Sequence, residues 1–163
     1  MTQTDTERFR SENNLRLVSV FYDGMQRMLC IVVDGARVSD EVGMPGTGSP
    51  EIDAIFGGSR AIEVLPGCRR YEVRFADAVG YLVRDESYAQ LDQNEDVSSV
   101  PRVQGETQFL TYMRAATFAE DVLDAPLEHW AVATLDDVVD VGTRQGAEPT
   151  ITSRVLTATD VWG

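Results

Sequence analysis

Acidic side chains are the most abundant functional groups of this sequence, and two clusters of them are the best candidates for catalysis or for binding a cation. Residues 84–88 read RDESY, so that two acidic residues follow an arginine and precede a serine and a tyrosine. Asp136, Asp137 and Asp140 form the second cluster. Paired carboxylates can act as acid and base when burial separates their pKa values, and they can also hold a hard cation. Acidic pairs are equally typical of turns, so spacing alone assigns no catalytic and no metal-ligating residue.

A single histidine limits the nucleophilic chemistry that the chain could perform. His129 would have to serve in any Ser-His or Cys-His pair. A zinc site would need Cys30, Cys68 and His129 to converge without the close Cys and His spacings typical of such sites. A structural hydrogen bond is the commoner role for a histidine beside Trp130 at the start of an expected strand. We therefore expect no metal at these residues.

Residues 43–50, GMPGTGSP, have the glycine spacing of a phosphate-binding loop but lack its other functional residues. Such a loop needs a lysine for the terminal phosphates and a hydroxyl for magnesium. Ser49 occupies the lysine position and Pro50 the hydroxyl position, and the chain contains no lysine at all. The absence of lysine also excludes Schiff-base and lysine-base chemistry. We interpret the segment as a surface loop and expect no cofactor.

The segment RDESY continues an apolar strand, and its side chains would form a binding site if they faced a shared cavity. The candidate binding rim consists of Arg84, Asp85, Glu86, Tyr88, Tyr112, His129 and Trp130. Tyr112, Trp130 and Tyr81 would then supply apolar walls. The interpretation that we favour is a rim network without a ligand, in which Arg84 pairs with a carboxylate and Tyr88 is half-buried, and the binding site is the alternative.

The elements that must position these side chains are mainly strands. Apolar patterning and turn signals predict strands over residues 15–21, 25–33, 69–75, 79–84, 129–135, 138–142 and 150–156. Short turns predict that the first two, the third and fourth, and the fifth and sixth of these strands pair as antiparallel hairpins. An edge segment is expected near Val103, and a long loop from Ser39 to Pro50.

One segment has convincing helical periodicity. In residues 107–118, Phe109, Tyr112, Met113 and Ala116 recur at helical spacing, and Thr107 is a suitable N-cap. Residues 51–56 suit one further helical turn capped by Ser49, with Pro50 suited to the first helical position. We expect a flexible N-terminal extension or a short helix over residues 1–13, one domain over residues 14–156 and a C-terminal tail over residues 157–163. The predicted class is α+β: a mainly antiparallel, curved or barrel-like sheet with one helix packed on it.

Three segments together resemble a set of small uncharacterised bacterial α+β proteins. They are YEVRFADAVGYLVRDESY (71–88), FLTYM (109–113) and EHWAVATLDDVVDV (128–141), and the resemblance lies in their order and spacing. It covers about residues 60–152. The resemblance implies the same order of strands and helix, and it implies no activity and no catalytic residue.

Charge and composition favour an acidic protein of the cytoplasm. The net charge is −13 over 163 residues, which argues against affinity for nucleic acid or for anionic membranes. The polar N-terminus has no apolar core of a secretory signal, and no apolar run is long enough to span a membrane. Cys30 and Cys68 are expected as buried free thiols. Residues 84–148 hold fourteen acidic residues and four arginines.

We therefore expect a non-catalytic acidic protein-binding module, similar in role to an inhibitor or immunity protein, with a basic protein as partner. The charge asymmetry and the lack of a recognisable catalytic constellation favour this hypothesis. The alternative is a β-rich protein with a small-molecule pocket, or a hydrolase that works through carboxylates near Asp85, Glu86 and His129. The sequence leaves the oligomeric state open.

Overall fold

The computed structural model of the chain describes residues 3–42, 46, 48–90, 93, 95, 102–103 and 106–162. Its strands are β1 (Leu15–Asp23), β2 (Met28–Gly35), β3 (Arg37–Val42), β4 (Arg60–Glu63), β5 (Arg69–Phe75), β6 (Ala78–Asp85), β7 (Arg102–Val103), β8 (Leu127–Ala133), β9 (Asp137–Arg144) and β10 (Thr150–Val155). Its helices are α1 (Asp5–Ser11), α2 (Pro50–Phe56), the 3-10 helix η1 (Glu86–Tyr88), α3 (Gln108–Ala116), α4 (Ala119–Leu123) and α5 (Ala158–Trp162).

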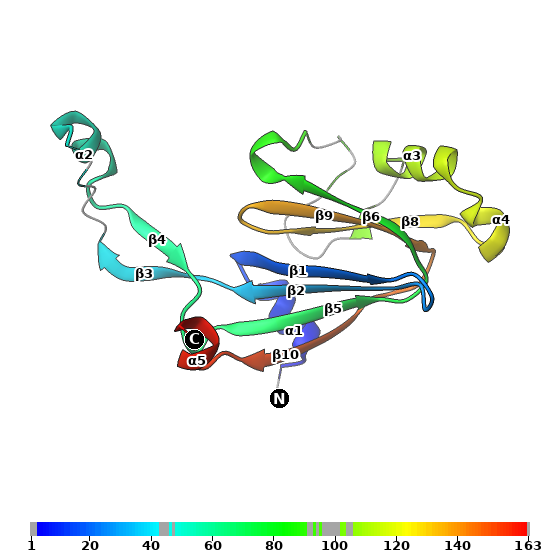
Figure 1. Cartoon of the computed structure of the whole chain (residues 1–163), viewed down its shortest axis with the longest axis horizontal. Helices are drawn as coiled ribbons and strands as arrows, with labels where there is room; N and C mark the ends of the chain where they lie inside the picture. The colour runs from blue at the N-terminus through cyan, green and yellow to red at the C-terminus, as the bar shows by residue number, and fades with distance from the viewer. Residues whose placement is uncertain are drawn as a thin grey trace.

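Two four-stranded antiparallel sheets form the body of the protein. The first sheet has the strand order β1-β2-β5-β10, and the second has the order β6-β9-β8-β7. The sheets lie one above the other (Figure 1), and their facing side chains form one buried cluster that includes Val73 and Phe75 of β5 with Val139 and Val141 of β9. The α+β class and the mainly antiparallel pairing are thus confirmed, but the sheets do not close into a barrel and several helices accompany them.

The pairing expected between residues 69–75 and 79–84 is wrong. β5 pairs with β2 and β10 in the first sheet, whereas β6 pairs with β9 in the second. The two-residue connection contains Asp77, which has a positive φ of 52° and forms an ion pair with Arg27. The Ala78 amide donates a hydrogen bond to the Arg27 carbonyl at 2.9 Å. These contacts with the β1–β2 turn lead β6 out of the first sheet.

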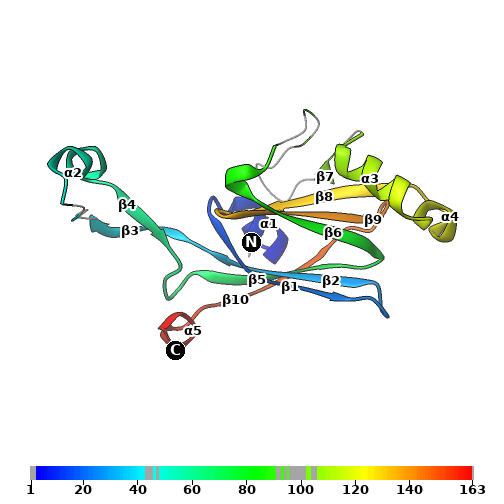
Figure 2. The same ribbon diagram turned by 45° about the horizontal axis from the view of Figure 1, so that its top comes forward.

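A two-stranded sheet of β3 and β4, with α2 beyond it, projects away from the body (Figure 1 and Figure 2). We call β3, α2 and β4 the arm. The loop expected from Ser39 is wrong for its first residues, because β3 continues to Val42 and pairs with β4. Residues 43–45 and 47 of the GMPGTGSP segment lie outside the described residues.

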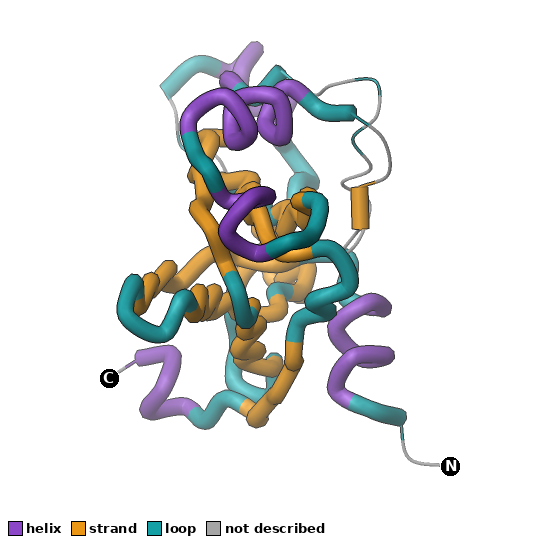
Figure 3. The backbone as a smooth tube through the Cα atoms, turned by 90° about the vertical axis from the view of Figure 1, so that its right-hand side faces the viewer, coloured by secondary structure: helices purple, strands orange, loops and turns teal. Residues whose placement is uncertain are grey.

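The two terminal helices lie on opposite sides of the strands (Figure 3). Residues 5–11 form α1, which packs through Phe9 against Tyr71, with ring centroids 5.1 Å apart. Asp5 ties α1 to β10, because its carboxylate accepts hydrogen bonds from the Ser153 amide at 3.0 Å and hydroxyl at 2.8 Å. In the described part of the chain, no helix is long and apolar enough to cross a membrane.

The helix expected over residues 107–118 is present as α3, and the predicted N-cap is confirmed. The Thr107 hydroxyl accepts a hydrogen bond from the Leu110 amide at 3.2 Å. The edge segment near Val103 is also present, as β7 beside β8.

We predict that Phe9→Ala destabilises the protein by about 3–5 kcal/mol, because truncating a buried phenylalanine leaves a cavity in the core. Phe9 is 1% exposed within the cluster shared by the two sheets. The free energy of unfolding in urea measures the loss. Phe118→Ala is the matched control, since Phe118 is 82% exposed. Equal losses in both variants would show that α1 does not contribute to the core.

Candidate functional site

Asp140 lies at the centre of the candidate site, on β9 between β6 and β8. Its cross-strand partners are Leu82 on β6 and Ala131 on β8. Alternate residues of a strand share a face, so Arg84 and His129 stand diagonally beside Asp140 on the same face of the sheet. The register of three strands therefore brings a cation and an imidazole to one carboxylate.

Arg84 neutralises Asp140 through two parallel hydrogen bonds. Nε donates to Oδ2 at 2.6 Å and Nη2 donates to Oδ1 at 2.8 Å, while the Asp140 side chain is 0% exposed. Nη2 also donates to Glu95 at 2.9 Å, and Nη1 to the Gln90 carbonyl at 3.2 Å. Burial lowers the pKa of Arg84, but the hydrogen bonds to both carboxylates outweigh it, so the pKa lies above its ordinary value. The guanidinium remains charged at every physiological pH.

His129 extends this network from Asp140 to α3. Its Nε2 lies 2.9 Å from Asp140 Oδ1, and its Nδ1 lies 3.1 Å from the Thr107 hydroxyl oxygen. The tautomer with hydrogen on Nε2 satisfies both contacts, since Nε2 donates to the carboxylate and Thr107 donates to Nδ1. Thr107 also accepts from the Leu110 amide as N-cap of α3. The buried network therefore runs from the helix cap through His129 and Asp140 to Arg84.

Two glycines let α3 approach the second sheet closely. A Cβ at Gly80 would meet the methyl carbon of Met113 at 2.9 Å, and one at Gly142 would meet it at 3.5 Å. The Phe109 ring lies 4.8 Å from the His129 ring, centroid to centroid. Met113 and Phe109 thus seat α3 over the network, and Phe109 covers His129.

A pocket of about 460 Å³ opens beside this network. It is lined by Leu82, Arg84, Asp85, Tyr88, Ala89, Gln90, Glu95, Gln108, Phe109, Tyr112 and Asp140. Tyr88 is 87% exposed rather than half-buried as expected, and Tyr112 is 65% exposed, so both rings face solvent at the pocket. The pocket therefore combines aromatic walls with a charged floor.

The structure brings four residues of the candidate rim to this pocket: Arg84, Asp85, Tyr88 and Tyr112. Asp85 also caps η1, because its carboxylate accepts a hydrogen bond from the Ser87 amide at 2.9 Å. Tyr112 lies on α3 and Tyr88 on η1, so two separate elements supply the aromatic walls.

The other three rim residues lie elsewhere. Glu86 is exposed at the start of η1 and does not line the pocket. His129 is 0% exposed and lies beneath Asp140. Trp130 faces the opposite side of β8, in the core between the sheets, with its ring centroid 6.1 Å from that of Phe75. Tyr81, expected as a wall, instead packs near Tyr22 at 6.0 Å.

Asp140, Glu95 and Phe109 line the pocket but were not assigned to it from the sequence. Asp140 carried a detectable signal, because it is the only charge in the apolar stretch VVDVG and needs a buried partner. Phe109 was assigned only to the apolar face of its helix. Glu95 stands in a polar segment without periodicity, and nothing in that segment indicates that it pairs with Arg84.

The connection Thr107–His129–Asp140 has the order of a hydrolase triad but is built as a structural element. Thr107 is 1% exposed and its hydroxyl caps α3, so no substrate reaches it in this conformation. Among the described residues, no three His, Cys, Asp or Glu side chains gather as metal ligands, and Cys30, Cys68 and His129 do not converge. The accessible hollow of this region is the pocket beside the network.

Comparisons of the chain with protein-family models, curated proteins and solved structures found no match.

We predict that Asp140→Asn lowers the free energy of unfolding by about 3–5 kcal/mol, because it removes the buried carboxylate that pairs with Arg84 through two hydrogen bonds and contacts His129, and leaves Arg84 with the carboxylate of Glu95 alone. Urea unfolding followed by circular dichroism measures the change. Asp136→Asn in the same hairpin is the control: its side chain is 63% exposed, and its ion pair with Arg16 spans 3.5 Å. That substitution costs less than about 1 kcal/mol. Losses of the same size at both positions would contradict a stabilising role for the buried pair.

Proposed function

We propose that the chain is a non-catalytic binding protein whose pocket beside α3 takes a small molecule with a cationic group and an apolar body. The observation that carries this proposal is an aromatic-walled pocket whose charged residues are mainly carboxylates. Asp85, Glu95 and Asp140 line it against the single cation of Arg84. A cationic ligand group would complement this excess of negative charge.

The walls suit the rest of such a ligand. Tyr88, Tyr112 and Phe109 present aromatic rings, and Leu82 adds apolar surface. Aromatic faces attract ammonium groups as well as apolar bodies. A volume of about 460 Å³ lies within the range of small-molecule sites. An amine carried on a flat apolar body is therefore the ligand class that this pocket would favour.

The arrangement favours binding over catalysis. Asp140 is held by two bonds from Arg84 and one contact from His129, which removes its freedom to act as a base. The hydroxyl closest to His129 caps a helix and is buried. We also propose that the protein acts in the cytoplasm, because Cys30 and Cys68 are both free thiols.

Phenethylamine and its neutral counterpart 2-phenylethanol test this proposal in a titration followed by ¹⁵N NMR. We predict that the amine shifts the amide signals of Leu82, Tyr88 and Tyr112 and binds more tightly than the alcohol. Asp85→Asn keeps an acceptor for the η1 cap but removes a charge. It should lower the affinity for the amine by about two- to fivefold, which is the effect of losing an exposed ion pair. The affinity for the alcohol should stay unchanged.

Asp121→Asn is the control for general loss of charge, since Asp121 lies exposed on α4 outside the pocket. Equal affinities for the amine and the alcohol, or shifts that lie away from the pocket, would refute the proposal.

The arm favours a second candidate function, an acidic protein-binding module with a basic protein partner. Val38, Val42, Ile52 and Ile55 of the arm are all more than two-fifths exposed. Five acidic residues accompany two arginines there: Asp40, Glu41, Glu51, Asp53 and Glu63 with Arg37 and Arg60. An apolar surface bordered by carboxylates fits a partner whose apolar patch is surrounded by basic residues.

For this second function we predict that wild-type protein retains a basic partner from a host lysate at low salt and loses much of it at high salt. Ile55→Arg should abolish retention, because it adds a positive charge to the apolar tip, where Ile55 is 76% exposed. Phe118→Arg provides the control at the N-cap of α4, away from the arm. Retention of the same proteins by both variants would exclude the arm as the docking surface.

A further inference from the structure

A second pocket, of about 280 Å³, lies where α1 meets the first sheet and the base of the arm. It is lined by Gln3, Arg8, Ser11, Glu12, Gly35, Arg37, Gly67, Cys68, Arg69 and Tyr71. Three of these residues are arginines and one is a glutamate. The lining therefore carries an excess of positive charge in a chain whose net charge is −13.

Arg37 and Arg69 place two incompletely used guanidiniums at this pocket. Arg37 donates from Nη2 to the Gly67 carbonyl at 3.0 Å, and Arg69 donates from Nη1 to the Ser153 hydroxyl at 2.9 Å. Neither has a carboxylate within ion-pair distance among the residues that the structure describes. Each therefore retains charge and donors for an anion.

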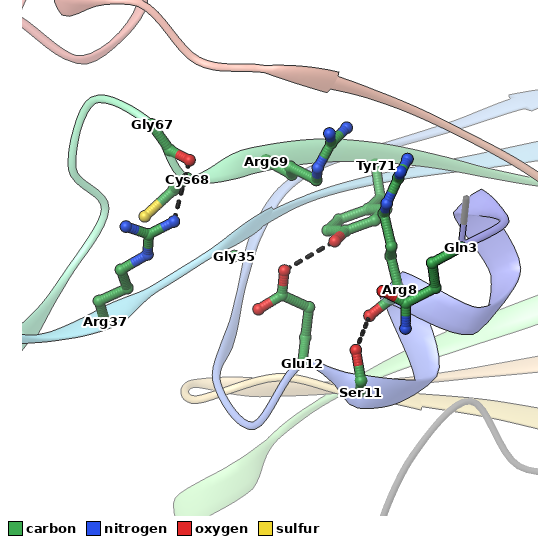
Figure 4. Close-up of a pocket in the computed structure, with 10 residues that line it drawn as sticks. All are labelled: Gln3, Arg8, Ser11, Glu12, Gly35, Arg37, Gly67, Cys68, Arg69 and Tyr71. Carbon is green, nitrogen blue, oxygen red and sulfur yellow. Dashed lines mark hydrogen bonds between the residues drawn. The ribbon is translucent and has the colours of Figure 1, made fainter. Parts of the chain in front are cut away.

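Arg8 adds a third guanidinium, which forms an ion pair with Asp5 at 3.1 Å. Figure 4 shows Arg8 and Arg69 toward one side of the pocket and Arg37 toward the other, beside Gly67 and Cys68. The Glu12 carboxylate points between them to Tyr71, whose hydroxyl donates to it at 2.7 Å. Burial and this hydrogen bond raise the pKa of Tyr71, while the charges of Arg69 and Arg8, which both line the pocket, oppose the rise.

We propose that this pocket binds a small molecule carrying phosphate or carboxylate groups. Guanidinium forks match the oxygen geometry of such groups and form charge-assisted hydrogen bonds with them. The preference is opposite in sign to that of the pocket beside α3, where carboxylates predominate. The two sites use different residues, so the anion site stands independently of the proposed function.

Titrations with inorganic phosphate and with citrate at constant low ionic strength test this site, read by ¹⁵N NMR on the full chain. Arg37→Gln and Arg69→Gln should each lower the affinity for the anion that binds by about fivefold or more. Hydrogen bonds to charged groups contribute more than hydrogen bonds between neutral groups. Glu12→Gln keeps an acceptor for Tyr71 and removes a repelling charge. It should tighten binding by about two- to fivefold.

Arg16→Gln is the matched control, because Arg16 is exposed on β1 and lines neither pocket. Thermal unfolding of each variant checks that it is folded, and Arg37→Gln keeps the test decisive if Arg69→Gln unfolds, because Arg37 is exposed. Binding of phosphate alone or of citrate alone supports the site and identifies the group that it prefers. Chloride shifting the same signals as strongly, equal weakening by Arg16→Gln, or looser binding in Glu12→Gln would each overturn the proposal.

Discussion

Asp140 brings a negative charge to a fully buried position in the second sheet, and its neutralisation organises the surroundings of the candidate site. An unpaired buried carboxylate is very costly, so the fold must supply a cation and hydrogen-bond donors in fixed positions. Arg84 supplies the cation from β6 and His129 supplies a donor from β8. Because Thr107 contacts His129 while capping α3, the same requirement fixes where the helix begins above the sheet.

The sequence predicted the local elements well, because their signals are local. Alternation in residues 69–75 and helical spacing in residues 107–118 depend only on neighbouring side chains, and the structure has β5 and α3 there. The failed hairpin between β5 and β6 has a different origin. A two-residue connection can form a hairpin or lead from one sheet to the other. Here the contacts of Ala78 and Asp77 with Arg27 favour the connection between sheets. Those contacts join residues about fifty positions apart, beyond any local pattern.

The site residues that are adjacent in the sequence could be predicted. The site residues that come from other strands, and that only the folded chain brings together, could not. Arg84, Asp85 and Tyr88 reach the pocket because RDESY spans the C-terminal end of β6 and the η1 turn that follows it. His129 and Trp130 could not both face it, since successive residues of a strand point to opposite faces. The sequence shows that the two side chains point to opposite faces of the strand. Which face lies outside the core depends on how the two sheets pack. The role of Glu95 could not be predicted from the sequence, because its pairing with Arg84 arises only in the folded chain.

The buried network also gives the pocket beside α3 a physical connection to the helix. Arg84 and Asp140 line the pocket, whereas Thr107 and His129 lie behind them. A cation bound near Asp85 and Glu95 would compete with Arg84 for carboxylate oxygens, and any change at Asp140 would alter the bond that holds His129. Since His129 contacts the N-cap of α3, and Tyr112 of that helix forms a pocket wall, ligand binding and the seating of α3 act on the same interactions. Contact with Tyr112 favours the seated helix, whereas competition with Arg84 loosens the network, so occupancy of the pocket should change the stability of α3 against local opening, and seating of the helix should change ligand binding by the same free energy.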